Sequence, residues 1–234
     1  MEEKLKSTLN RTPWSLILKA CAFGASWLLL PFWAVFLVGL YFYFTPFFQP
    51  FKLLVPFVLT LAASLYIPQG FWFAVFLGIL FFLILGIKNL IFVNRYENHQ
   101  MMVFLLLFVI FFGAFSHFEN WQKWFISIVS PAVALSFFFL FRELCDYCVE
   151  RDRRKINLMA GLGAFLIWQA FIIALFLPLN YFYQTALLFL SSVILTDIFL
   201  EHLNGTLNKR KMLGDFSIFF TVTAVMLASA NWGL

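Results

Sequence analysis

The amino-acid sequence predicts an all-α, polytopic transmembrane helical bundle, with about eight spans arranged as hairpins and joined by short loops. Of the 234 residues, 63% are hydrophobic and 12% are charged, whereas soluble domains carry about 25% charged residues. Apolar runs long enough for a bilayer core of about 30 Å follow one another along the chain. Helix is the expected state, because an open strand edge in hydrocarbon would leave backbone polar groups without partners.

The first apolar run, Trp14–Phe44, is the longest and exceeds the roughly 20 residues that one span needs. Pro31 lies inside it and is interpreted as a kink in one long helix, whose N-terminal part with Lys19 lies in the membrane interface. The alternative is a tight hairpin at Pro31, which would give nine spans. Residues 1–13 are expected to be a short, retained polar segment, because they carry charges of both signs and the run that follows is too long for a signal peptide.

Seven further runs follow the first one. They are Phe51–Ile67, Phe71–Val93, Met101–Phe115, Trp124–Cys145, Leu158–Pro178, Tyr183–Leu203 and Phe216–Trp232. Only short polar breaks separate them, so no room remains for a soluble domain. We therefore expect residues 1–234 to form a single integral membrane domain, in the cell membrane.

Basic residues predict the orientation, because cytoplasmic loops are enriched in Lys and Arg. With eight spans, eleven of the 16 Lys and Arg residues fall on one side, including the loops Arg151–Lys155 and Lys209–Lys211. This side is predicted to be cytoplasmic, which places both termini outside. The basic residues of the N-terminal segment, Lys4, Lys6 and Arg11, argue against that arrangement.

Known catalytic motifs are missing from the sequence, so it names no reaction. It contains no G-x-S-x-G, H-E-x-x-H, Walker or G-x-G-x-x-G pattern. The pair Cys145 and Cys148 forms one C-x-x-C, but zinc requires four ligands and no second pair exists. We expect no metal, no cofactor and no assigned catalytic residue. Nucleic-acid binding is also not expected, because no soluble surface is available to carry it.

Acidic residues near one helix end need an explanation. Asp197 and Glu201 are four residues apart, so they share a helix face and repel each other. Lys and Arg can extend to the interface along their stems, but the short Asp197 side chain cannot. A charge within a span is costly, so we expect Asp197 to pair with a cation, Arg142 first and Lys88 second.

The sequence therefore predicts a polar binding cluster at the cytoplasmic edge. Its members are Lys88, Arg142, Glu143, Asp146, Asp197, Glu201 and His202. The cluster would bind a phospholipid head group, coordinate a cation or relay a proton; the alternative is an ion-pair lattice that ties helix ends together. The basic loops would attract anionic lipid head groups. Gln169, inside the sixth span, is expected to hydrogen-bond another helix.

Three functions remain open. The first is lipid or small-solute handling of a carrier-like kind, with membrane lipids as partners. The second is a non-catalytic subunit or scaffold of a membrane assembly, either a homo-oligomer or a complex with another membrane protein. The third is an intramembrane enzyme that acts on a lipid-linked substrate.

Overall fold

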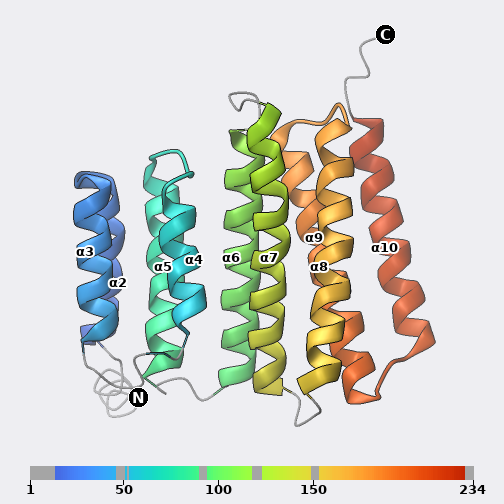
Figure 1. Ribbon diagram of the computed structural model, residues 1–234, viewed down its shortest axis with the longest axis horizontal. Coiled ribbons are helices and arrows are strands. Elements are labelled where there is room, and N and C mark those ends of the chain that lie inside the picture. Colours follow the sequence, from blue (N-terminus) through green and yellow to red (C-terminus); the bar gives the residue numbers. More distant parts are fainter. Residues whose placement is uncertain are drawn as a thin grey trace, which may run out of the picture. The chain divides into compact units, whose positions relative to one another are not determined.

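The computed structural model is helical throughout the part of the chain that it describes, residues 14–45, 51, 53–89, 94–117, 123–148 and 153–229. These residues form nine helices and no strand (Figure 1). Six helices are long and apolar enough to cross a membrane, and three are shorter apolar helices. The predicted fold class is confirmed. The chain divides into two compact units, Met1–His99 and Gln100–Leu234, called the first and the second unit below.

The described residues of the first unit form four complete helices, which run alternately up and down (Figure 1). They are α2 (Trp14–Leu29), α3 (Phe32–Phe44), α4 (Leu54–Ser64) and α5 (Phe71–Lys88). Helix α2 packs along α5 and beside α3, and α4 packs on α5. The rings of Phe23 and Phe81 stack with their centroids 4.3 Å apart, which joins α2 to α5 in the core of the unit.

The first apolar run is a hairpin of two helices, so the prediction of one kinked span is wrong and the alternative at Pro31 is right. Helix α2 ends at Leu29, and the extended Pro31 (φ −64°, ψ 152°) precedes the first residue of α3. A residue before proline is disfavoured in the helical region, and proline has no N–H for the preceding turn. The chain therefore reverses here, and eight predicted spans become nine helices in the described residues.

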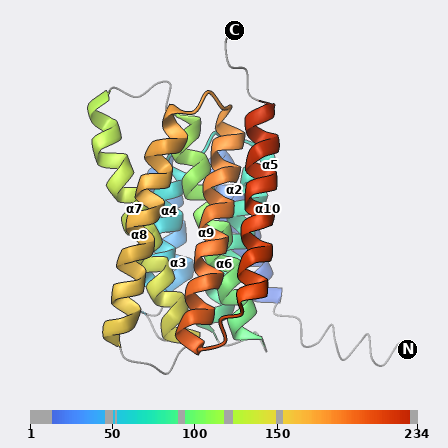
Figure 2. The same ribbon diagram turned by 90° about the vertical axis from the view of Figure 1, so that its right-hand side faces the viewer.

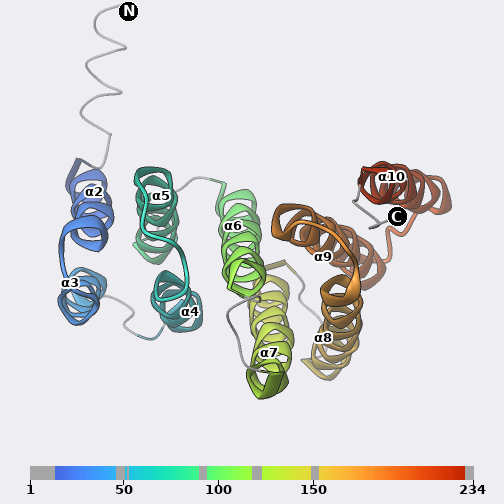
Figure 3. The same ribbon diagram turned by 90° about the horizontal axis from the view of Figure 1, so that it is seen from above.

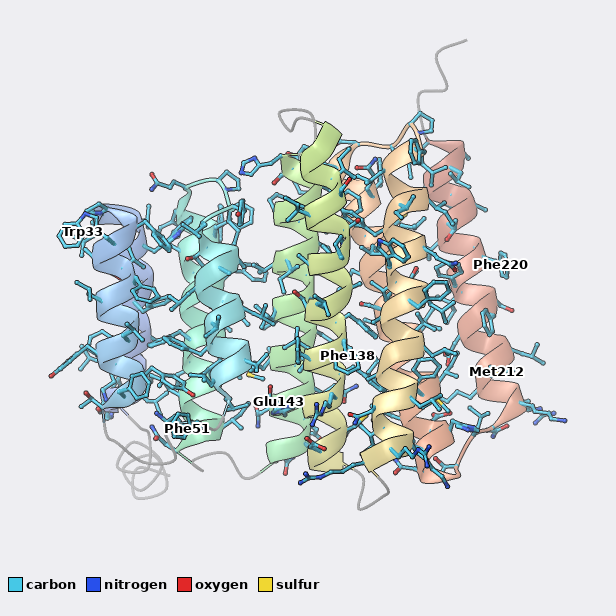
Figure 4. The ribbon with its side chains drawn as sticks, viewed as in Figure 1. Trp33, Phe51, Phe138, Glu143, Met212 and Phe220 are labelled. Atoms are coloured by element: carbon cyan, nitrogen blue, oxygen red, sulfur yellow. The ribbon has the colours of Figure 1, made fainter. Side chains whose placement is uncertain are left out.

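The hairpin determines which helix ends lie together in the first unit. The Lys19 ammonium, near the start of α2, donates to the Thr45 carbonyl at 2.6 Å. Lys88, at the end of α5, donates to the Tyr43 carbonyl. The start of α2 thus lies with the ends of α3 and α5. Trp33 lies at the opposite end from Phe51 (Figure 4), and the turn at Pro68-Gln69-Gly70 lies with Trp33. With eight predicted spans, this turn would follow the second span and share a side with the N-terminus, so that expectation is wrong.

Helices α2 and α5 approach closely because glycines lie at their crossing. A Cβ atom on Gly24 would be 2.7 Å from the Ala74 carbonyl oxygen, closer than real Cβ contacts. A Cβ atom on Gly78 would be 3.3 Å from the Ala20 carbonyl oxygen. The backbones themselves are in contact here, as small residues permit between membrane helices.

The second unit holds the longer helices. They are α6 (Arg95–Ser116, which begins just before the boundary), α7 (Lys123–Cys148), α8 (Arg153–Phe176), α9 (Tyr181–Asn204) and α10 (Lys209–Ala228). Helix α8 packs on both α7 and α9, as Figures 2 and 3 show. Helix α6 contacts α9 through the rings of Phe108 and Phe189, whose centroids are 5.6 Å apart.

Helix α10 is the least packed element of the second unit. It contacts α9 and has no buried residue, and it stands at the edge of the unit in Figure 3. Gly205 ends α9 in the left-handed conformation (φ 71°), and Asn208 caps the start of α10 by accepting from the Arg210 amide at 3.0 Å. A single turn thus sends the chain back along α9 and leaves most of α10 exposed.

Candidate functional site

The acidic pair of the predicted cluster lies at the end of the second unit where α9 ends and α10 begins, which we call the basic end. Asp197 and Glu201 are both half-buried on α9. Glu201 forms an ion pair with Lys211 in the first turn of α10. The Gln100 amide of α6 donates to the Asp197 carboxylate at 3.4 Å. Helices α6 and α10 therefore hold the two acids from different sides.

The predicted pair of Asp197 with Arg142 is wrong. Across the described ranges, the one ion pair joins Lys211 and Glu201. Arg142 lies half-buried on α7, but α9 packs mainly on α8 and α10 and only slightly on α7. The prediction was based on the equal depth of Arg142 and Asp197 in the membrane. Helix packing, however, decides which helix faces contact each other.

Lys88 does not pair with Asp197 either, because its ammonium group makes its contacts inside the first unit. Its side chain is 1% exposed. The ammonium donates to the Tyr43 carbonyl and lies 3.9 Å from the centroid of the Tyr43 ring. Carbonyls at a helix C-terminus lack intrahelical donors, and a cation is favoured there and over an aromatic face. Lys88 therefore terminates α3.

The other members of the predicted cluster lie at the same end without forming a compact site. Glu143 is half-buried on α7, while Asp146 and His202 are exposed. Figure 4 shows Glu143 and Met212, in the first turn of α10, both at the basic end of the second unit. Among the described side chains, no three His, Cys, Asp or Glu residues are placed to hold a metal ion. Binding by this cluster stays a prediction.

Lys211 is a member that the sequence reasoning missed, because Lys209–Lys211 was interpreted as a loop. The structure begins α10 at Lys209, seven residues before the predicted start at Phe216. The signal was present: Asn208 is a preferred N-cap residue directly before this segment. Once the helix starts there, Lys211 faces Glu201.

A second candidate site is a groove between α7 and α8, towards the end of the unit opposite the basic end. Its volume is about 390 Å³, and it is lined by Ile126, Ser127, Ser130, Pro131, Trp168, Ile172, Leu175 and Phe176. We call it the α7–α8 groove. Pro131 beside Ser130 within an apolar run indicates a possible helix break in the sequence, but the sequence does not predict a groove with α8.

Polar groups of α7 open into the wall of this groove. Pro131 lies inside α7 and has no N–H, so the Ser127 carbonyl four residues earlier lacks its helical donor. Ser130 is 5% exposed, and its hydroxyl forms no hydrogen bond with any group that the structure describes. This hydroxyl remains accessible from the groove, where a partner can complete its hydrogen bond in apolar surroundings. The groove thus offers a donor and two acceptors in apolar surroundings.

The first unit has a groove of a different kind. It lies between α2 and α5, its volume is about 460 Å³, and its lining includes Cys21, Ala25, Leu28 and Phe82. No oxygen-bearing or charged side chain lines it. It can accept a hydrocarbon chain, but it has no polar side chain that would select a head group.

Comparison of the chain with protein-family models, with curated proteins and with solved structures finds no match. The six long apolar helices indicate an integral membrane protein. The function is therefore argued from the residues of the sites themselves.

Proposed function

We propose that the chain is a multi-pass protein of the cell membrane that handles lipid, and that it binds a neutral lipid with a hydroxyl group in the α7–α8 groove. The single observation that carries the proposal is that Ser130, which has no hydrogen-bond partner among the described residues, lines this groove together with Ser127, whose carbonyl Pro131 leaves without a helical donor. A lipid hydroxyl would donate to that carbonyl and accept from Ser130.

The lining supports an uncharged amphiphile. Ile126, Ile172, Leu175 and Phe176 provide an apolar wall, and binding sites for small molecules typically combine such a wall with a few placed polar groups. No charged side chain lines the groove, so a phosphate or a carboxylate would enter without a counter-charge, at a high cost.

Depth also favours a neutral lipid. Ser130 lies seven residues after Lys123, the first residue of α7, which corresponds to about 10 Å along a helix. This level is below the head groups of ordinary phospholipids and within the hydrocarbon core. A diacylglycerol or a long-chain alcohol carries a hydroxyl that can reach it, whereas a charged head group remains at the surface.

The proposal is tested by binding of a fluorescent diacylglycerol to the purified protein in detergent. Ser130→Ala should weaken binding about five- to tenfold, the usual effect of one lost hydrogen bond. Ser136→Ala is the matched control, because this serine is also buried on α7 but already donates to the Ala132 carbonyl at 2.8 Å. Equal affinities of wild type and Ser130→Ala would refute the proposal.

Helix α10 supports the second candidate function, a non-catalytic subunit of a membrane assembly. None of its residues is buried, although it is apolar enough to span a membrane. One exposed face carries small residues at helical spacing, Gly214, Ser217, Thr221, Ala224 and Ala228, as helix interfaces in membranes often do. If α10 docks on another protein, co-purification from membranes should be lost when Ser217→Leu and Ala224→Leu are combined.

A further inference from the structure

One face of α8 is apolar, exposed and regularly spaced. It consists of Leu158, Leu162, Phe165, Gln169, Ile172 and Phe176, which we call the α8 stripe. The positions are alternately four and three residues apart, the spacing that lets two helices pack along a common seam. All are exposed except the half-buried Ile172; Leu158, Phe165 and Phe176 are 63%, 51% and 84% exposed.

Gln169 is the polar residue of this stripe. It lies seven residues before Phe176, the last residue of α8, or about 10 Å from that helix end. Its amide is exposed, and it forms no hydrogen bond with the residues that the structure covers. Hydrocarbon offers neither donors nor acceptors, so an amide at this depth needs a partner from another helix.

We propose that the α8 stripes of two copies of this chain pack against each other about a two-fold axis, with the Gln169 amides hydrogen-bonded across it. A primary amide has both an acceptor oxygen and donor hydrogens, so two copies related by a two-fold axis complete each other. In such an interface each residue faces the same region of its partner. A single polar residue within an apolar seam also fixes the register of the two helices.

The exposed small-residue face of α10 does not present the same need, because the hydroxyl of this helix that has no partner in the described residues, that of Thr223, is enclosed within the unit. On α10, the Thr221 hydroxyl donates to the Ser217 carbonyl at 2.8 Å, so the polar group at the middle of its small-residue face is already satisfied. Gly161 borders the α8 stripe, and a Cβ atom on it would meet nothing within 4 Å. The second chain can therefore approach α8 closely on that side.

The test is cross-linking in membranes with a chain whose three cysteines, Cys21, Cys145 and Cys148, are replaced by alanine. Phe165→Cys places one thiol on the stripe and leaves Gln169 intact. Phe220→Cys is the matched control: this phenylalanine is 67% exposed on α10, and it lies eleven residues after the start of its helix where Phe165 lies twelve after the start of α8. Figure 4 labels Phe220.

Oxidation should yield a disulfide-linked dimer from Phe165→Cys and little from Phe220→Cys. Adding Gln169→Leu to Phe165→Cys should raise the dimer dissociation constant about three- to tenfold, the range measured for polar contacts between membrane helices. Gln169→Asn should restore most of the dimer, because it keeps the amide. The readout is the dimer fraction as the protein is diluted with lipid.

The proposal is overturned if Phe165→Cys stays monomeric, if both cysteine positions cross-link equally, or if Gln169→Leu leaves the dimer fraction unchanged. A Gln169 partner inside the same chain would give the first of these results. The variants avoid Ser127, Ser130 and the two residues that the stripe shares with the α7–α8 groove. The outcome is thus independent of lipid binding in that groove.

Discussion

Several polar side chains of the first unit donate to carbonyls of other helices, whereas one groove-lining and one exposed polar side chain of the second unit do not. In the first unit, the ammonium groups of Lys19 and Lys88 donate to carbonyls at the end of α3, and the Trp27 indole donates to the Ser64 carbonyl at 2.9 Å. In the second unit, Ser130 and Gln169 have no such partner among the described residues. The two side chains on which our proposals of a ligand and of a partner depend therefore both lie in the second unit.

The comparison first predicts an orientation. In the first unit the start of α2 and Lys88 lie at one end, and the sequence has only six residues between Lys88 and Arg95, the first residue of α6, too few to cross a bilayer core of about 30 Å. Fifteen of the 16 Lys and Arg residues then share one side, and only Lys123 lies on the other. We expect this side to be cytoplasmic.

The orientation is tested with a membrane-impermeant thiol reagent on intact cells, in the cysteine-free chain. Ser7→Cys should be protected, because the N-terminal segment would be cytoplasmic, while Ser229→Cys at the end of α10 should react. Labelling of Ser7→Cys to the same extent as Ser229→Cys would contradict the arrangement. The outcome is all-or-none, so this is the largest expected effect.

Gly24→Leu tests the close packing of α2 against α5 in the first unit. The Gly24 Cβ position is 2.7 Å from a backbone oxygen that cannot move aside, so we expect a loss of about 3 kcal/mol in the free energy of unfolding. Gly214→Leu on α10 is the control, because a Cβ atom there meets nothing within 4 Å; its effect should be below about 0.5 kcal/mol. Denaturation in mixed detergent measures both. Equal losses would show that the α2–α5 contact is not tight.

Lys88→Met tests the hydrogen bond from the Lys88 ammonium to the Tyr43 carbonyl within the same unit. The change keeps the volume but leaves the Tyr43 carbonyl without its donor, which should cost about 1–3 kcal/mol. Arg210→Met, an exposed basic residue of α10, should change the stability little. The midpoint of thermal unfolding distinguishes them. An unchanged midpoint for Lys88→Met would mean that this carbonyl finds water or another donor.

The smallest effect is expected at the basic end of the second unit. Lys211 and Glu201 are 52% and 22% exposed, and such surface pairs contribute about 0.2–1 kcal/mol. A double-mutant cycle with Lys211→Met and Glu201→Gln should give a coupling energy in this range, decreasing with added salt. A larger coupling that salt does not change would point to a buried site there.

Composition and run lengths were sufficient to predict membrane helices and most of their positions, because lipid imposes one backbone solution on every apolar run. The hairpin at Pro31 was less certain, because proline also occurs inside helices, as Pro131 does in α7. Partners of charged residues were predicted poorly. The depth of a residue along its helix follows from the sequence. Which helix faces the acidic residues of α9, α10 or the α7 helix that carries Arg142, depends on the packing of the whole unit. Pro131 beside Ser130 indicated a possible helix break, but the groove itself also needs residues of α8 that lie far away in the sequence.

The most direct test of the account maps where a neutral lipid binds. A diacylglycerol that carries a photoactivatable diazirine on one acyl chain would be cross-linked to the protein in liposomes, and the labelled peptides identified by mass spectrometry. Labelling should concentrate in Ile126–Pro131 and Trp168–Phe176 and decrease about five- to tenfold in Ser130→Ala. Equal or stronger labelling of the larger apolar groove between α2 and α5, unaffected by Ser130→Ala, would contradict it.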